Sequence, residues 1–176
     1  MLDLRGAWNP VGGDDFQFDI GPGAGAAPAW SPAPAPRLVT VRTGAGAGGS
    51  DRITFVWPDR AIRNAWLRVT VKSNADTGLA QSDVFYFGNL IGETGLGAGD
   101  DDTALTVNAL DLVSTRRHRA PGLAAPVTSP FDFNRDGRVN ALDMAAARAT
   151  PSRSLALLAP PALARVFSAT ALVREE

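Results

Sequence analysis

Apolar and polar residues alternate along several stretches in the first part of the chain. Because successive side chains of a strand point to opposite faces, this period predicts half-buried strands. The alternating stretches cover residues 16–20, 52–57 and 62–72, and residues 38–41 can form a further short strand. Segments rich in glycine and proline separate them, at 21–36 and 44–50, where we expect loops. This spacing predicts an antiparallel β-sandwich, immunoglobulin-like but partial, because fewer strands are visible than the roughly seven of a complete one.

A five-residue motif occurs twice in the second part of the chain. Val107-Asn108-Ala109-Leu110-Asp111 recurs as Val139-Asn140-Ala141-Leu142-Asp143, a shift from 107 to 139, or 32 residues. Helix-forming residues follow each copy, at 112–119 and 144–148, and a proline comes soon after each of them. We therefore expect two units, each a loop followed by a short helix.

Oxygen-bearing side chains before the second helix have the spacing of an EF-hand calcium loop. They stand at positions one, three, five, nine and twelve of residues 132–143, with Gly137 at position six, where a sharp turn is needed. A polar turn without metal is the alternative, but the number of correctly placed oxygens favours Ca²⁺. The expected ligands are Asp132, Asn134, Asp136, the backbone carbonyl of Arg138, Asn140 (directly or through water) and Asp143.

The loop before the first helix is degenerate, and three interpretations stay open. Counting back from Asp111 gives the candidate ligands Asp100, Asp102, Thr106, Asn108 and Asp111, but apolar Ala104 and Leu105 fill the fifth and sixth positions. In an enlarged loop, Asn89 and Glu93 would supply the early ligands and residues 95–105 would be an insertion. The third interpretation is that this half binds no metal and serves packing alone.

Composition narrows the function classes. The 176 residues carry a net charge of −1 and no cysteine, which gives no general attraction to nucleic acid or membranes and excludes thiolate metal sites and disulfides. No apolar run is long enough to span a bilayer, so we expect no membrane span. The first residues, 1–6, lack the basic and apolar regions of a signal peptide, so we expect any export signal to lie outside this sequence.

Candidate catalytic groups are few. His118 is the only histidine and stands in a basic run, where a solvated helix end is the expected role. The adjacent acids at 100–102 have no fixed separation of the kind that glycosidases need. A cysteine nucleophile is impossible, and no motif supports a serine triad. The sequence therefore predicts a protein that is not an enzyme.

Two loop–helix units with aspartate at the twelfth position resemble a type I dockerin module, over residues 85–150. Residues 66–71 and 85–93 also resemble C-terminal regions of large secreted proteins from planctomycete-like bacteria. The resemblance implies an extracellular, calcium-binding module that docks into a cohesin domain, in proteins that often carry glycoside hydrolases. The chain departs from this pattern at loop positions ten and eleven, where dockerins usually present hydroxyl residues to the cohesin. Those partner-binding positions are Ala109, Leu110, Ala141 and Leu142 here.

The predicted fold class is therefore α+β, a partial sandwich followed by a small helical domain of two calcium-loop–helix units. The expected boundaries are 1–82 for the sandwich, 83–152 for the dockerin-like domain and 153–176 for an apolar tail. That tail could pack on the sandwich or pair with the N-terminal strand. The predicted function is a noncatalytic calcium-binding module that docks or tethers a secreted protein, with a cohesin-like domain or the chain's own sandwich as its partner. The alternative is a calcium-rigidified structural terminus of an extracellular polysaccharide-degrading enzyme, without a docking partner.

Overall fold

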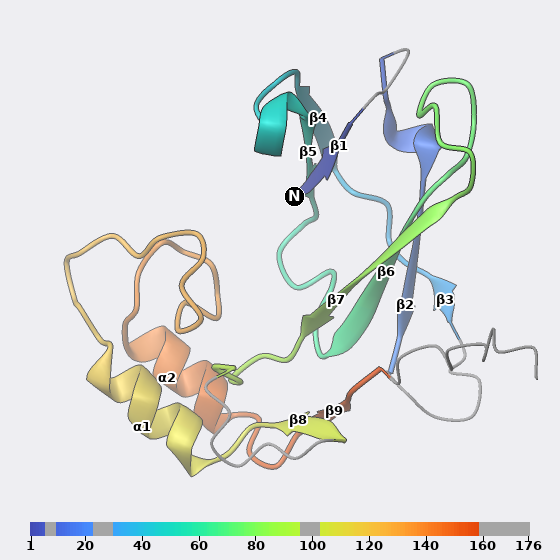
Figure 1. Ribbon diagram of the computed structural model, residues 1–176. Helices are drawn as coiled ribbons and strands as arrows, with labels where there is room; N and C mark the ends of the chain where they lie inside the picture. The colour runs from blue at the N-terminus through green and yellow to red at the C-terminus, as the bar shows by residue number, and fades with distance from the viewer. Residues whose placement is uncertain (6–9, 23–29, 96–102, 159–176) are drawn as a thin grey trace, which may run out of the picture.

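The computed structural model describes residues 1–5, 10–22, 30–95 and 103–158, and two antiparallel sheets make up its larger part (Figure 1). The first sheet has the order β1 (Leu2–Leu4), β5 (Asp51–Val56), β4 (Leu38–Arg42). The second has the order β3 (Ser31–Pro32), β2 (Phe16–Gly21), β6 (Ala65–Val71), β7 (Asp83–Asn89). Short 3₁₀ turns, η1 (Gly13–Asp15) and η2 (Ala47–Gly49), precede β2 and β5. The strands predicted at 16–20, 38–41, 52–57 and 62–72 are confirmed as β2, β4, β5 and β6.

The core of this part lies between the two sheets. Ile53 of β5 and Val69 and Val71 of β6 are completely or almost completely buried, because the alternation places them on the inner face. Aromatic rings close the core from both sheets. Phe55 packs edge to face against Phe16 and Phe18, with ring centroids 4.8 and 5.1 Å apart, a favourable arrangement of the two quadrupoles.

The predicted fold class is wrong. Over the described residues the chain is mostly β-sheet, with nine strands in three sheets and only two short helices, and it lacks a helical domain of two calcium-loop–helix units. The segment in front of the first helix is a strand, β8 (Ala104–Thr106), which pairs with β9 (Ser154–Ala156). The physical reason lies in Leu105 and Val107. These apolar side chains gain more from burial against Leu155 than a polar loop would gain there.

The two helices, α1 (Ala109–Arg117) and α2 (Ala141–Arg148), pack against each other beside the sheets (Figure 1). Each begins at the asparagine of the repeated motif. The side chain of Asn108 accepts a hydrogen bond from the backbone N–H of Leu110, and Asn140 does the same for Leu142. Both helices end before the proline that follows them, as predicted.

A small apolar cluster joins the helical part to the sheets. Leu90, Val107 and Leu155 are buried together, and Trp66 of β6 packs against them. The indole N–H of Trp66 donates to the carbonyl of Ala156 in β9 at 2.7 Å. The described start of the C-terminal tail therefore pairs with β8 and contacts the second sheet, while its remainder, 159–176, lies outside the described residues.

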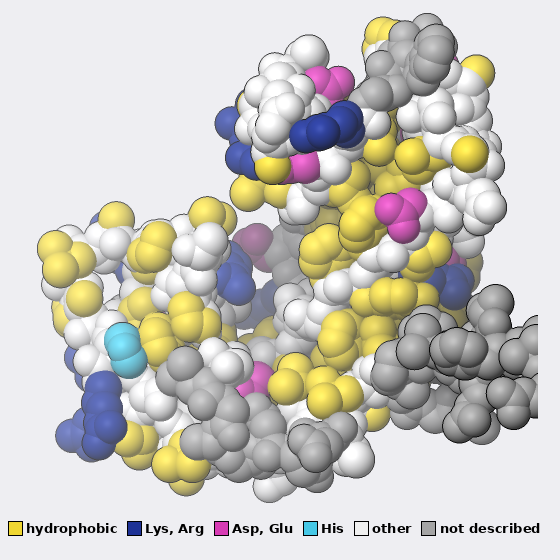
Figure 2. Space-filling view, in the orientation of Figure 1, with side chains coloured by type: hydrophobic (Ala, Val, Ile, Leu, Met, Phe, Trp, Pro, Cys, Tyr) yellow, Lys and Arg dark blue, Asp and Glu magenta, His cyan; other side chains and the backbone are white. Residues whose placement is uncertain are grey.

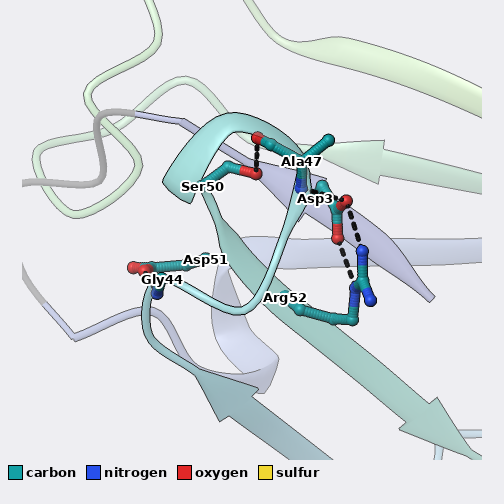
Figure 3. Close-up of polar contacts among 6 residues, drawn as sticks. All are labelled: Asp3, Gly44, Ala47, Ser50, Asp51 and Arg52. Carbon is teal, nitrogen blue, oxygen red and sulfur yellow. Dashed lines mark hydrogen bonds and ion pairs between the residues drawn. The ribbon is translucent and has the colours of Figure 1, made fainter.

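An ion pair fastens the short N-terminal strand β1 to β5 (Figure 3). Arg52 donates from Nε and Nη2 to the two carboxylate oxygens of Asp3, at 2.8 and 2.9 Å, and the backbone N–H of Ala47 donates to the same carboxylate at 2.9 Å. These hydrogen bonds hold the pKa of Asp3 well below its usual range. The hydrogen bond from Ala47 also holds η2 against β1.

Candidate metal centre

The loop 132–143 runs into the first turn of α2, and its two end carboxylates are buried. Asp143 has 0% exposure and Asp132 has 3%. The Asp143 carboxylate accepts hydrogen bonds from the backbone N–H groups of Phe133 and Asn140, both at 2.8 Å. Asp143 therefore ties the start of the loop to the start of the helix.

Backbone donors also hold the carboxylate of Asp132. Its two oxygens accept from the N–H groups of Asp136 at 3.1 Å and Gly137 at 2.9 Å. Gly137 has φ of +80°, the left-handed conformation that the sequence predicts for the sixth position. The loop thus closes back on its first residue.

The remaining predicted ligand side chains meet at the exposed side of the loop. Asn134 Nδ2 and Asn140 Nδ2 donate to the same oxygen of Asp136, at 3.0 and 3.3 Å. The other oxygen of Asp136 accepts the backbone N–H of Arg138 at 2.9 Å. The structure therefore brings the oxygen-bearing residues of positions three, five and nine together, and it places position seven beside them.

The neighbouring guanidinium group is turned away from these acids. Arg135 donates to the carbonyls of Ser129 at 2.7 Å and Val127 at 3.4 Å. Across the described residues, the ion pairs of the fold join Asp3 to Arg52 and Asp19 to Arg68, and none involves the loop. Asp132 and Asp143 are therefore buried without a basic partner in the described structure, as Asp15 and Asp111 are too. A buried charge is normally paired, hydrogen-bonded or coordinates a metal.

The donor chemistry of the loop fits a hard cation. A carboxylate has about four lone-pair sites, so Asp132 and Asp143 keep acceptor capacity beyond their backbone hydrogen bonds. Three carboxylates, two amide oxygens and one carbonyl are the ligand types that Ca²⁺ takes, in a geometry it tolerates flexibly. Within the ranges that the structure describes, no three His, Cys, Asp or Glu side chains form a metal-binding group. A cation here would accordingly depend on the amide and carbonyl oxygens as well as the acids.

The first repeat holds its last aspartate in the same way. Asp111 is buried and accepts from the backbone N–H of Thr94 at 3.0 Å, the hydroxyl of Thr94 at 2.7 Å and the N–H of Asn108 at 2.8 Å. The backbone N–H of Thr94 thus donates to Asp111 in the same way as the backbone N–H of Phe133 donates to Asp143. In the first unit 17 residues separate the two partners, against 10 in the second. Glu93, one of the early ligands of the enlarged-loop interpretation, directly precedes Thr94, as Asp132 directly precedes Phe133.

The other predicted residues of the first loop lie in different places. Asn89 ends β7 opposite Ala65, in the second sheet. Thr106 is in β8, and its carbonyl accepts from the Asn108 side chain at 3.0 Å. Asp100 and Asp102 lie outside the described residues. Sequence reasoning missed Thr94, and the only signal for it is a hydroxyl residue next to Glu93.

The predicted partner-binding residues are all at the surface. Ala109 and Ala141 are exposed, and Leu110 and Leu142 keep 49% and 61% of their surface accessible. Each leucine stands two residues after the asparagine cap of its helix. The repeat therefore presents the same apolar pair twice, on two helices that pack together.

The single histidine has a packing role in the structure. The His118 ring stacks on Phe131, with centroids 3.9 Å apart and planes 10° from parallel. Its Nδ1 lies 2.8 Å from the carbonyl oxygen of Ser114, so this nitrogen carries the proton and donates.

Among the described residues, no helix is both long and apolar enough to cross a membrane.

No family model, curated protein or solved structure matches the chain.

Proposed function

We propose that this chain is a noncatalytic calcium-binding module that docks a secreted protein to a protein partner outside the cell. The observation that carries the proposal is the pair of buried carboxylates at the two ends of loop 132–143. Asp143 is fully buried, is held by backbone N–H groups and has no basic partner in the described structure. A cation bound by the loop would supply the missing positive charge.

Each loop residue has a definite part in this proposal. Ca²⁺ would be held by the side chains of Asp132, Asn134, Asp136, Asn140 and Asp143 and by the carbonyl of Arg138. Bound calcium would offset most of the charge of the three carboxylates of the loop. Because Asp143 also belongs to the first turn of α2, the metal would couple loop closure to helix stability.

The exposure of the repeated Ala-Leu pairs supports docking over the purely structural alternative. A structural terminus without a partner would bury Leu110 and Leu142 between the helices, and instead both are about half accessible or more. Each helix exposes a leucine at the same position after its asparagine cap, and exposed apolar residues of this kind are candidates for contact with a partner. A cohesin-like domain, or another protein with an apolar face, is the kind of partner that these residues suit.

Calorimetric titration with calcium tests the metal site. We expect one calcium to bind the loop, with a dissociation constant of roughly 10⁻⁴ to 10⁻³ M or tighter, the range of extracellular modules. Asp136→Ala should weaken binding at least about tenfold, because a hard cation loses a charged ligand. Asp59→Ala, the same change at an exposed turn in the first part of the chain, is the matched control. Unaltered binding by Asp136→Ala would overturn the assignment of the site.

The docking part has its own experiment. A protein captured from the culture medium in calcium would be identified, purified and titrated with the chain in calcium and in chelator. We expect Leu142→Asp and Leu110→Asp to weaken that complex about tenfold or more, because a charge placed in an apolar contact must be desolvated. Leu123→Asp, at another exposed leucine, should leave it unchanged. A partner that binds both helix variants like the wild type, or equally well in chelator, would count against the proposal.

A further inference from the structure

We propose that two copies of this chain associate through β7, whose outer edges pair antiparallel and merge the two four-stranded sheets. β7 is the last strand of its sheet, and its one side is paired to β6 along seven residues, from Asp83 opposite Val71 to Asn89 opposite Ala65. Within the described residues no strand pairs with its other side. The backbone N–H and C=O groups on that side are a ready template for another strand.

The edge of β7 is apolar over most of its length, and its one protection is at the first residue, where the Asp83 carboxylate accepts the backbone N–H of Val84 at 2.8 Å. Val84, Tyr86 and Phe87 are 40%, 48% and 42% exposed, and Figure 2 shows hydrophobic side chains gathered over the region of β6 and β7. Asp83 is the only charged residue of the strand, and it stands at one end. The strand has no lysine or proline, and its register with β6 continues without a bulge. Monomeric proteins usually place such features on a free edge to prevent pairing.

An apolar hollow lies on the inner side of the same edge. It has a volume of about 470 Å³ and lies between the edge strands of the two sheets, because Phe85 and Phe87 of β7 line it together with Met1 and Leu2 at the start of β1. The ion pair of Asp3 and Arg52 forms its polar side. A strand added to β7 would place alternate side chains over this hollow. The hollow beside the inner face of β7 therefore has room for bulky apolar side chains from a partner strand.

The sequence of β7 favours a second copy of itself as that strand. An antiparallel pair centred on Tyr86 sets Asp83 opposite Asn89, Val84 opposite Gly88 and Phe85 opposite Phe87 of the other copy. No like charges meet in this register, and the Val84 side chain faces a glycine, which leaves it room. Both phenylalanines of the second copy fall on the inner side, where the hollow is. Dimers with two-fold symmetry are the commonest homo-oligomers.

Introducing a charge at Tyr86, the residue that meets its own copy at the two-fold axis, tests the pairing. Tyr86→Lys places two cations directly opposite each other, and Tyr86→Glu two anions, so each variant should be monomeric where the wild type is a dimer. An equimolar mixture of the two should dimerise again. Sedimentation velocity over roughly a hundredfold range of protein concentration measures this, since a dimer dissociates on dilution by mass action. Val41→Lys, on the exposed edge strand β4 of the other sheet, is the matched control and should leave the dimer intact.

A milder pair of variants covers the event that Tyr86, which packs 5.8 Å from Trp30, is needed for folding. Asn89→Asp sets a carboxylate opposite Asp83 at both ends of the ladder and should weaken the dimer about tenfold. Adding Asp83→Asn removes the repulsion and should restore it. A monomeric wild type, or a dimer that ignores the changes at both ends of β7, would overturn the proposal. A strand from another protein on this edge would appear as a monomeric wild type that binds that protein.

Discussion

Removing calcium with a chelator is expected to speed the exchange of the α2 backbone amides about a hundredfold, while β2 and β6 stay protected. A ligand that binds only the folded loop stabilises it in proportion to the logarithm of its concentration, so about 100 times the dissociation constant gives roughly a hundredfold effect. The effect should reach α2 because Asp143 belongs both to the loop and to the first helical turn. Without the cation, Asp132, Asp136 and Asp143 repel one another as the loop closes.

Hydrogen exchange followed by mass spectrometry, in calcium and in chelator, measures this response. The strands β2 and β6 are the internal control, since their core lies between the two sheets and is separate from the loop. The α1 helix should respond less than α2, because Asp111 has its own hydrogen bonds to Thr94 and is not part of the intact loop. Equal protection of 142–148 in both solutions would show that packing alone holds α2.

The second large effect is expected in the sheet core. Val71→Ala should lower the free energy of unfolding by about 2–3 kcal/mol, because the lost methyl groups leave a cavity in a fully buried position. The melting temperature would fall by roughly 5–10 °C for a chain of this size. Calorimetry or denaturant titration gives the value.

Val41→Ala is the matched control for this substitution. Both valines lie on strands, but Val41 is 37% exposed on the edge strand β4, whereas Val71 is completely buried on β6. The control should cost less than about 1 kcal/mol. Equal losses at the two positions would mean that the inner face of β6 is not the tightly packed core that its burial indicates.

The fold-class prediction failed where strands give no alternating signal. Residues 83–89 include four consecutive apolar residues, and in β7 nearly all of its side chains are exposed because the strand stands at a sheet edge. The alternation that identifies a half-buried strand is absent under those conditions. The second failure concerned β8, whose three residues are too few for a periodic signal and which becomes a strand only through β9.

By itself the sequence determined the local features of this protein. Alternation located β2, β5 and β6, because burial of one face imposes a period of two on the residues. The repeated asparagine motif located both helix starts, since the cap bonds only to residues beside it in the chain. The spacing of oxygen-bearing side chains in 132–143 identified the candidate ligands, since they too are close together in the chain.

Only the tertiary structure decided the contacts between distant segments. It paired Thr94 with Asp111 across 17 residues, joined β8 to β9 across about 50, and left Leu110 and Leu142 at the surface. Loop closure costs little more entropy for a long loop than for a short one, so many pairings of such segments are nearly equal in that cost. Burial of Val107 and Leu155 in one cluster then selects among them, and this selection depends on three-dimensional packing that no local pattern contains.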